Sequence, residues 1–332
     1  MIKLVVTLLV IMPSIAIANS CVVLLYHNFS QSTPKSTSIS PVLFEQHLEY
    51  LKDNNFNVLS LSDMVQDLKN DSLPIRCVSL TADDAYISIY KNAYPLLKKY
   101  KMPLSVFVST DSIDKGFKAM MSWNNMREMK NEGVEFYNHS IAHPYLIDTA
   151  LKETNYQIIH AQERLKSELG VNEKMFAYPY GEENIELLDN IEKLGYIGFG
   201  QHSGAISYGN DLSNLPRFPM TDRFGDMKSF KLKVNTMSMP VIYKRTSSVV
   251  YNVLPILELE FIEPLTKSKQ KQLACYVGAG KALINWSSDR TVSIKYNKHI
   301  SSRRFRYNCT LPSDKKNIYY WFSKQYINDQ KG

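Results

Sequence analysis

The sequence predicts an α/β fold built on parallel strands, followed by a small β-rich domain. Between residues 21 and 201, short apolar runs alternate with segments whose apolar residues recur at helical spacing. This alternation is typical of parallel strands covered by helices. Acidic, imidazole and phenol side chains follow several of the apolar runs, at the strand ends where parallel sheets carry their sites.

The first region reads as alternating strands and helices. The opening run, CVVLLYH, is continuously apolar, as expected for a strand buried on both faces. Ser40 is placed to cap the first helix, with Pro41 in its first turn, and Gly170 is placed to end the longest helix. Strands are predicted at 21–27, 56–61, 77–84, 103–110, 134–140, 174–181 and 196–201, and helices at 40–55, 62–70, 85–100, 122–133, 151–170 and 184–195.

After about residue 230 the pattern changes to short β-type runs between turn residues. These runs cover 247–263, 271–278, 281–288, 290–297, 304–310 and 317–327. Their aromatic side chains suit either a carbohydrate-binding module or the core of a small disulfide-bonded domain. We therefore predict a catalytic domain at 19–230 and an accessory domain at 231–332, after an N-terminal segment at 1–18.

The N-terminal segment has the features of a secretory signal peptide. Lys3 precedes the mostly apolar run 4–11, Pro13 breaks that run, and Ala16 and Ala18 form a small-residue cleavage site. A lipid anchor on Cys21 is an alternative, but the usual aliphatic residue before such a cysteine is lacking. We expect an exported protein, periplasmic or extracellular, with no transmembrane segment.

The four cysteines are expected to form disulfides, because export permits them. Four cysteines allow three pairings. Cys21 and Cys77 each open an apolar run, whereas Cys275 and Cys309 both lie in the last part of the chain. We predict the pairs Cys21–Cys77 and Cys275–Cys309, with four free buried thiols as the alternative.

The composition is that of a globular chain that favours anionic surroundings. Of the 332 residues, 44% are hydrophobic and 21% charged, and the formal net charge is +7. This charge suits an anionic surface or polymer. No block of Lys and Arg interleaved with aromatics is present, so a nucleic-acid partner is not expected.

Two motifs predict a metal site. Asp83 and Asp84 stand side by side where a strand ends, and His139 and His143 are four residues apart after another strand. Two imidazoles and one carboxylate leave an open position, as a catalytic zinc site requires. The second carboxylate can then act as a base. A solvated turn and an unrelated histidine pair are the alternatives for the two motifs taken singly.

These motifs, in this order, resemble those of the polysaccharide deacetylase family, carbohydrate esterase family four. The family's T-F-D-D-G corresponds to residues 81–85, its H-[ST]-x-x-H to 139–143, and its third motif to Tyr178-Pro179-Tyr180-Gly181. The segment LLYHNFS and the helix and strand after it resemble the branch with poly-N-acetylglucosamine deacetylases. The resemblance covers roughly residues 21–220 and implies a distorted (β/α) barrel with fewer than eight strands.

The resemblance also implies roles for individual residues. Asp83 would be the general base, and the backbone N–H of Tyr180 would help stabilise the oxyanion. The residues that would hold a divalent metal, most often zinc, are Asp84, His139 and His143. The reaction would be hydrolysis of an acetamide on a sugar, which makes the protein a hydrolase of carbon–nitrogen bonds other than peptide bonds.

The chain departs from the family pattern at several positions. Ala82, Ala85 and Ala177 replace the usual phenylalanine, glycine and arginine. Arg217 is a substitute for the missing arginine, with a structural arginine as the alternative. The family's last motif, which supplies a histidine as general acid, is not found. His202 is the nearest candidate, and His27 is a second pocket candidate, for which a structural histidine is the alternative.

Aromatic residues near the motifs are candidates for substrate binding. Tyr145, Tyr178 and Tyr180 are placed to contact sugar rings, whereas Trp123 is expected to pack. The predicted function is an exported, metal-dependent deacetylase of an N-acetylglucosamine-containing polysaccharide or oligosaccharide. An O-acetyl esterase and a catalytically silenced carbohydrate-binding protein are the alternatives. The oligomeric state is open, with a monomer expected.

Overall fold

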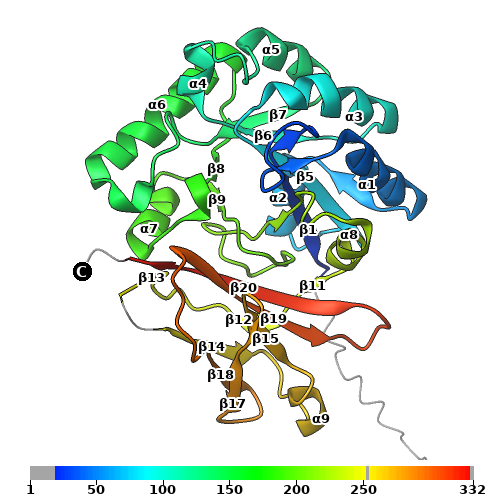
Figure 1. Ribbon diagram of the computed structural model, residues 1–332, viewed down its shortest axis with the longest axis vertical. Coiled ribbons are helices and arrows are strands. Elements are labelled where there is room, and N and C mark those ends of the chain that lie inside the picture. The colour runs from blue at the N-terminus through cyan, green and yellow to red at the C-terminus, as the bar shows by residue number, and fades with distance from the viewer. Residues whose placement is uncertain (1–18, 252–253, 330–332) are drawn as a thin grey trace, which may run out of the picture.

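A computed structural model describes residues 19–251 and 254–329 of the chain. The segment predicted as a signal peptide, residues 1–18, lies outside the described residues. Within the described part, no helix combines the length and apolar character needed to cross a membrane. Figure 1 shows a curled sheet ringed by helices, with a second β-rich body beside it.

The curled sheet is entirely parallel and confirms the predicted distorted (β/α) barrel. Its strands run in the order β10-β1-β5-β6-β7-β8-β9, and β4 pairs with the start of β5. Because all pairs are parallel, the carboxyl ends of the strands meet at one edge of the sheet. The strands are β1 (Cys21–Tyr26), β4 (Asn57–Leu59), β5 (Cys77–Asp83), β6 (Ser105–Val108), β7 (Glu135–Asn138), β8 (Met175–Ala177), β9 (Ile197–Phe199) and β10 (Phe218–Pro219).

Helices cover the outer face of this sheet, as predicted from the apolar periodicity (Figure 1). Ser40 caps α1 by accepting a hydrogen bond from the Leu43 backbone N–H, and Gly170 ends α6 in a left-handed conformation, with φ 66°. The helices are α1 (Pro41–Asp53), α2 (Leu61–Lys69), α3 (Tyr94–Tyr100), α4 (Thr110–Asp114), α5 (Trp123–Asn131), α6 (Leu151–Leu169), α7 (Ile185–Lys193) and α8 (Met227–Val234); a π-helical turn, Ile89–Ala93, leads into α3, and β2 (Asn28–Phe29) pairs with β3 (Ser38–Ile39).

The C-terminal part consists of two sheets that share a hydrophobic core. One has the order β11-β20-β19-β15-β16, with β13 on β20, and the other has the order β12-β14-β18-β17. Leu259, Ile294 and Tyr307 from the two sheets belong to one buried cluster. The elements are β11 (Met237–Ser238), β12 (Val241–Ile242), β13 (Val249–Val250), β14 (Ile256–Phe261), α9 (Lys267–Gln270), β15 (Ala274–Val277), β16 (Gly280–Lys281), β17 (Leu283–Trp286), β18 (Thr291–Lys295), β19 (Arg304–Pro312) and β20 (Tyr319–Asn328).

Both predicted disulfides are present. Cys21 and Cys77 are register partners on the neighbouring parallel strands β1 and β5, and they are bonded. Cys275 and Cys309 are register partners on the antiparallel strands β15 and β19, and they are also bonded. The first bond ties the start of the central strand of the barrel, and the second ties the sheet that lies against the barrel.

The β19–β20 hairpin lies against the loop that follows β8. The Gln325 side chain donates from Nε2 to the backbone oxygen of Gly181 over 2.6 Å. Arg303, just before β19, donates to both carboxylate oxygens of the buried Glu182, over 2.9 and 2.8 Å. The C-terminal sheet therefore contacts the same loop that carries Tyr180. The described residues form separate buried clusters in the two parts, and the domain boundary at residue 230 stays a prediction.

Candidate active site

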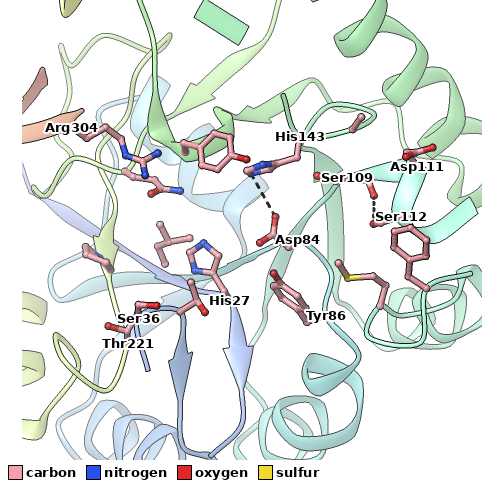
Figure 2. A pocket seen from close by; sticks show the side chains of 18 of the residues that line it. His27, Ser36, Asp84, Tyr86, Ser109, Asp111, Ser112, His143, Thr221 and Arg304 are labelled. Atoms are coloured by element: carbon pink, nitrogen blue, oxygen red, sulfur yellow. Dashed lines mark hydrogen bonds and ion pairs between the residues drawn. The ribbon is translucent and has the colours of Figure 1, made fainter. Parts of the chain in front are cut away.

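Most of the predicted site residues meet at the carboxyl edge of the parallel sheet. Asp83 is the last residue of β5, His139 follows β7, and Tyr180 lies in the short 3-10 turn Pro179–Gly181 after β8. A cavity of about 610 Å³ opens at this edge, and its wall includes Asp84, His143 and Tyr180, whereas Asp83 and His139 are fully buried. Figure 2 shows His27, Asp84 and His143 projecting into this space.

Asp84, His139 and His143 form a compact group of possible metal ligands. Asp84 Oδ1 lies 3.6 Å from His139 Nε2 and 3.7 Å from His143 Nε2. All three ligand atoms lie within 4.8 Å of one another, and the two imidazole centroids are 4.7 Å apart. Asp84 thus converges with two histidines that lie 55 and 59 residues further along the chain.

Left-handed backbone conformations produce this convergence. Ser140 and His143 have φ of 69° and 54°, so the chain coils and turns both imidazoles the same way. The coil is held by the Ser140 hydroxyl, which accepts from the His143 backbone N–H over 3.0 Å. Asp84 and Ala85 are also left-handed, with φ of 71° and 57°. Non-glycine residues in this region cost roughly 1–2 kcal/mol each, so the site stores strain, including at the position where the family pattern has glycine.

The protonation of His139 fits a bound cation. His139 Nδ1 lies 2.8 Å from the backbone oxygen of Ala177, which can only accept, so Nδ1 carries the proton and Nε2 presents a lone pair. Nε2 is buried without a hydrogen-bond partner, facing the carboxylates of Asp84 and Asp83. Burial lowers the pKa of His139 to about 3 and also lowers that of His143, so both rings are neutral at pH 7. A lone pair held against carboxylates is favourable only when a cation lies between them, so these residues fit a divalent metal.

Asp83 is held by Arg217 in a fully buried pair. Arg217 donates from its two terminal nitrogens to Oδ1 and Oδ2 of Asp83, over 2.7 and 2.9 Å, and from Nε to the Gly200 carbonyl over 2.9 Å. Burial alone raises the pKa of Asp83, but the Arg217 guanidinium outweighs it and the pKa falls to about 2. Arg217 lies just before β10, on the far side of β1 from Asp83, and its role as a substitute for the motif arginine absent at Ala177 stays a prediction.

Tyr180 links the metal-ligand group to the rim of the cavity. It is left-handed, with φ 60°, and its backbone N–H has no backbone acceptor among the described residues. Its ring meets the His143 ring edge-on at 4.4 Å and stacks on Tyr145 at 4.1 Å. Tyr145 therefore lies at the rim, beside the cavity wall.

Three other candidates, Tyr178, His202 and Trp123, do not line this cavity. Tyr178 is fully buried, and its hydroxyl donates to the Ser213 backbone oxygen over 2.6 Å, so it packs in the core and does not contact substrate. His202 lines a separate, smaller cavity under the C-terminal sheet, away from the metal-ligand group. Trp123 on α5 donates to Asp114, as expected for a packing residue.

His27 and two arginines reach the cavity instead. His27 follows β1, the neighbour of β5, and its Nδ1 is buried without a partner. Arg304 and Arg306 come from β19 of the C-terminal sheet and also line the cavity. The place of His27 after a strand was visible in the sequence, whereas nothing in the sequence indicates that β19 faces the barrel.

Comparison with known proteins agrees with this geometry. The sequence profile of the family described as polysaccharide deacetylase matches residues 70–198. A Bacillus subtilis protein named as a polysaccharide deacetylase is 30% identical over 197 residues, which cover 59% of this chain and 69% of the relative. The chain belongs to the polysaccharide deacetylase family.

Other members of the polysaccharide deacetylase family are similar to a comparable extent. The poly-β-1,6-N-acetyl-D-glucosamine N-deacetylase of Staphylococcus aureus is 28% identical over 211 residues, covering 60% of this chain and 73% of that protein. The Streptococcus pyogenes deacetylase PplD in complex with acetate superposes with a TM-score of 0.61 at 29% identity, over 65% of this chain and 98% of that one. IcaB from Ammonifex degensii, at 24% identity and a TM-score of 0.58, shares the fold.

Proposed function

We propose that this polysaccharide deacetylase is an exported, metal-dependent enzyme that removes N-acetyl groups from an N-acetylglucosamine-containing glycan. The observation that carries the proposal is the group Asp84, His139 and His143 opening onto a cavity beside Asp83, a carboxylate kept ionised by Arg217. The name of the Staphylococcus aureus relative supports this substrate class. The two disulfides support export.

The metal would be held by Asp84, His139 and His143, three ligands that leave a position open. When bound, a divalent cation supplies Lewis acidity and lowers the pKa of water. Zinc is the cation we propose, because two imidazoles and a carboxylate form one of the known catalytic zinc ligand sets. The hydrogen bond from His139 Nδ1 to Ala177 orients that ligand, in the way that outer partners orient metal-binding histidines.

The chain's own residues divide the proton transfers. Asp83 takes a proton from water as the water oxygen bonds to the acetamide carbon, and Arg217 keeps Asp83 ionised until then. The Tyr180 N–H donates to the oxygen that gains charge. As the carbon–nitrogen bond breaks, His27 gives a proton to the leaving amine, because its side chain projects into the same cavity as Asp84 and His143 (Figure 2). The products are acetate and a free amino sugar.

The function is tested by acetate release from β-1,6- and β-1,4-linked N-acetylglucosamine oligomers and from acetylated xylan, with and without zinc. Zinc-dependent release from an N-acetylated oligomer supports the proposal. Release from acetylated xylan alone would make the protein an O-acetyl esterase. Binding without release from any substrate would make it a carbohydrate-binding protein, although such a protein need not keep Asp83, Asp84, His139 and His143.

Asp84→Asn is expected to lower zinc affinity while leaving the base in place. Loss of an outer partner of a metal ligand costs roughly 10–100-fold in metal affinity, and loss of the ligand charge itself should cost at least as much. Excess zinc should then restore part of the activity. Zinc content after dialysis and activity against zinc concentration check this; full zinc occupancy in Asp84→Asn would contradict it.

His27→Gln is expected to lower kcat roughly 10²-fold, because a positioned proton donor contributes at least that much. Zinc content should not change, since His27 is outside the ligand group. The matched control is His160→Gln on α6, where the exposed imidazole pairs with Glu163. A kcat equal to that of the parent in His27→Gln would assign the proton donor elsewhere.

A further inference from the structure

Two arginines of the C-terminal sheet form part of the cavity that holds the proposed metal site. Arg304 and Arg306 lie on β19 with one residue between them, so their side chains project from the same face of the strand. Both line the cavity together with Asp84 and His143. In Figure 2, Arg304 extends into the cavity from the side opposite Asp111.

Arg306 has no carboxylate partner among the described residues. Its Nε donates to Oε1 of Gln325 over 2.8 Å, and its two terminal nitrogens donate to no other described residue. The pKa of Arg306 is lowered to about 10, mainly by burial and to a smaller extent by the neighbouring Arg304 cation. The guanidinium of Arg306 therefore stays charged at neutral pH. A half-buried guanidinium without a counter-ion is costly, and a bound anion would remove that cost.

The positive charge of Arg304 is only weakly offset by neighbouring carboxylates. Among the described residues, Arg304 has one ion pair, to Glu182 Oε1 at 3.5 Å, and Arg303 already donates to both oxygens of that carboxylate. The Arg304 guanidinium lies over the Tyr180 ring, 5.3 Å from its centroid. One aromatic ring thus separates Arg304 from His143.

The carboxylates that line the cavity do not offset these two cations. Asp84 belongs to the group that would hold the metal, and Asp111 on the opposite side pairs with Lys115 over 2.6 Å. The arginine end of the cavity is therefore positively charged. The net charge of +7 on the whole chain acts in the same direction.

Gln325 fixes the arginines relative to the catalytic loop. Its Oε1 accepts from Arg306, while its Nε2 donates to the Gly181 backbone oxygen next to Tyr180. One amide side chain thus bridges β19 and the loop after β8.

We propose that Arg304 and Arg306 form a subsite that binds an oxyanion of the glycan, a carboxylate or a phosphate. The anion would lie on the sugar that loses its acetyl group or on the next sugar, because only Tyr180 separates the two ends of the cavity. The inference rests on the proposed function and specifies its substrate. Guanidinium groups suit this ligand, since they bind carboxylate and phosphate through paired hydrogen bonds.

The test compares matched oligosaccharides on the whole protein. One set alternates glucuronate with N-acetylglucosamine, its control is the same oligomer with the carboxyl groups reduced to alcohols, and a third bears phosphate on a neutral N-acetylglucosamine oligomer. Binding is measured as Kd by calorimetry, and deacetylation as kcat/KM from acetate release. The parent should bind one charged oligomer roughly 10-fold or more tighter than its neutral counterpart, as a charge-assisted pair provides. The oligomer preferred identifies carboxylate or phosphate as the ligand.

In Arg306→Gln and in Arg304→Gln the ratio of charged to neutral affinity should fall toward one. Lys316→Gln removes the same charge from the exposed turn at the other end of the hairpin and should keep the parent ratio. If Arg306→Gln does not fold, Arg304→Gln decides, because its side chain is partly exposed. Equal affinity of the parent for charged and neutral oligomers, or an unchanged ratio in the arginine variants, would overturn the subsite. A preference in Kd without acetate release would overturn the proposed function and leave the subsite standing.

Discussion

Asp83→Asn is expected to lower the rate of acetate release roughly 10²–10⁴-fold while zinc stays bound. A positioned general base contributes about this factor, and the amide of asparagine cannot accept a proton at neutral pH. The group Asp84, His139 and His143 is untouched by the change. Excess zinc should therefore fail to restore activity, in contrast to Asp84→Asn.

The comparison of the two aspartate variants separates base from ligand. Zinc content and kcat are measured on the same samples, at a temperature well below the melting point of each variant, because Asp83→Asn also weakens the pair with Arg217. Loss of zinc in Asp83→Asn with retention in Asp84→Asn would reverse the two roles. Two variants as active as the parent would place the active site elsewhere.

The candidate site at the carboxyl edge of the sheet was predictable because each of its residues follows or ends a strand that could be recognised locally. A strand that ends in Asp83 and a strand that leads into His139 must present these residues at the same edge of a parallel sheet. The coil from His139 to His143 follows from residues near in sequence. The cysteine pairs were predictable because two cysteines open predicted strands of the first part and the other two lie in the last part of the chain.

Contacts between distant segments were not predictable in the same way. His202 follows β9 and so was a reasonable candidate, but its backbone oxygen accepts from the Arg217 N–H and its ring faces the C-terminal sheet. Tyr178 directly follows β8, yet its side chain packs in the core. The alternation along β19 places Arg304 and Arg306 on one face, but only the docking of the two sheets shows that this face meets the cavity.

Replacing Arg217 by methionine is expected to lower the free energy of unfolding at pH 7 by about 3–5 kcal/mol, because removal of one partner leaves the other charge buried and unpaired. Arg217 and Asp83 are both fully buried. Arg217→Lys keeps the charge but cannot donate to both oxygens of Asp83 in the same way. Its free energy of unfolding should therefore lie between that of the parent and that of Arg217→Met. The free energy of unfolding of all three proteins is measured by urea denaturation at pH 7.

In Arg217→Met, the pH dependence of the stability contributed by Asp83 should be opposite in sign to that in the parent. In the parent, the pKa of Asp83 is about 2, below its unfolded value of about 3.9, so the pair stabilises the fold above pH 4 and this stability is lost as the pH falls toward 2. Without Arg217, burial raises the pKa of Asp83 above the unfolded value. The variant then gains stability relative to the parent on acidification, and the acid limb of its kcat/KM profile moves to higher pH.

The double variant Arg217→Met/Asp83→Asn distinguishes the lost charge pair from a mere packing defect. If the unpaired carboxylate causes the instability, neutralising it should recover most of the 3–5 kcal/mol, and the two substitutions will be strongly non-additive. If the instability came from packing around the methionine, the double variant would be at least as unstable as Arg217→Met. The interaction that keeps Asp83 ionised for catalysis would then make no separate contribution to the stability of the fold.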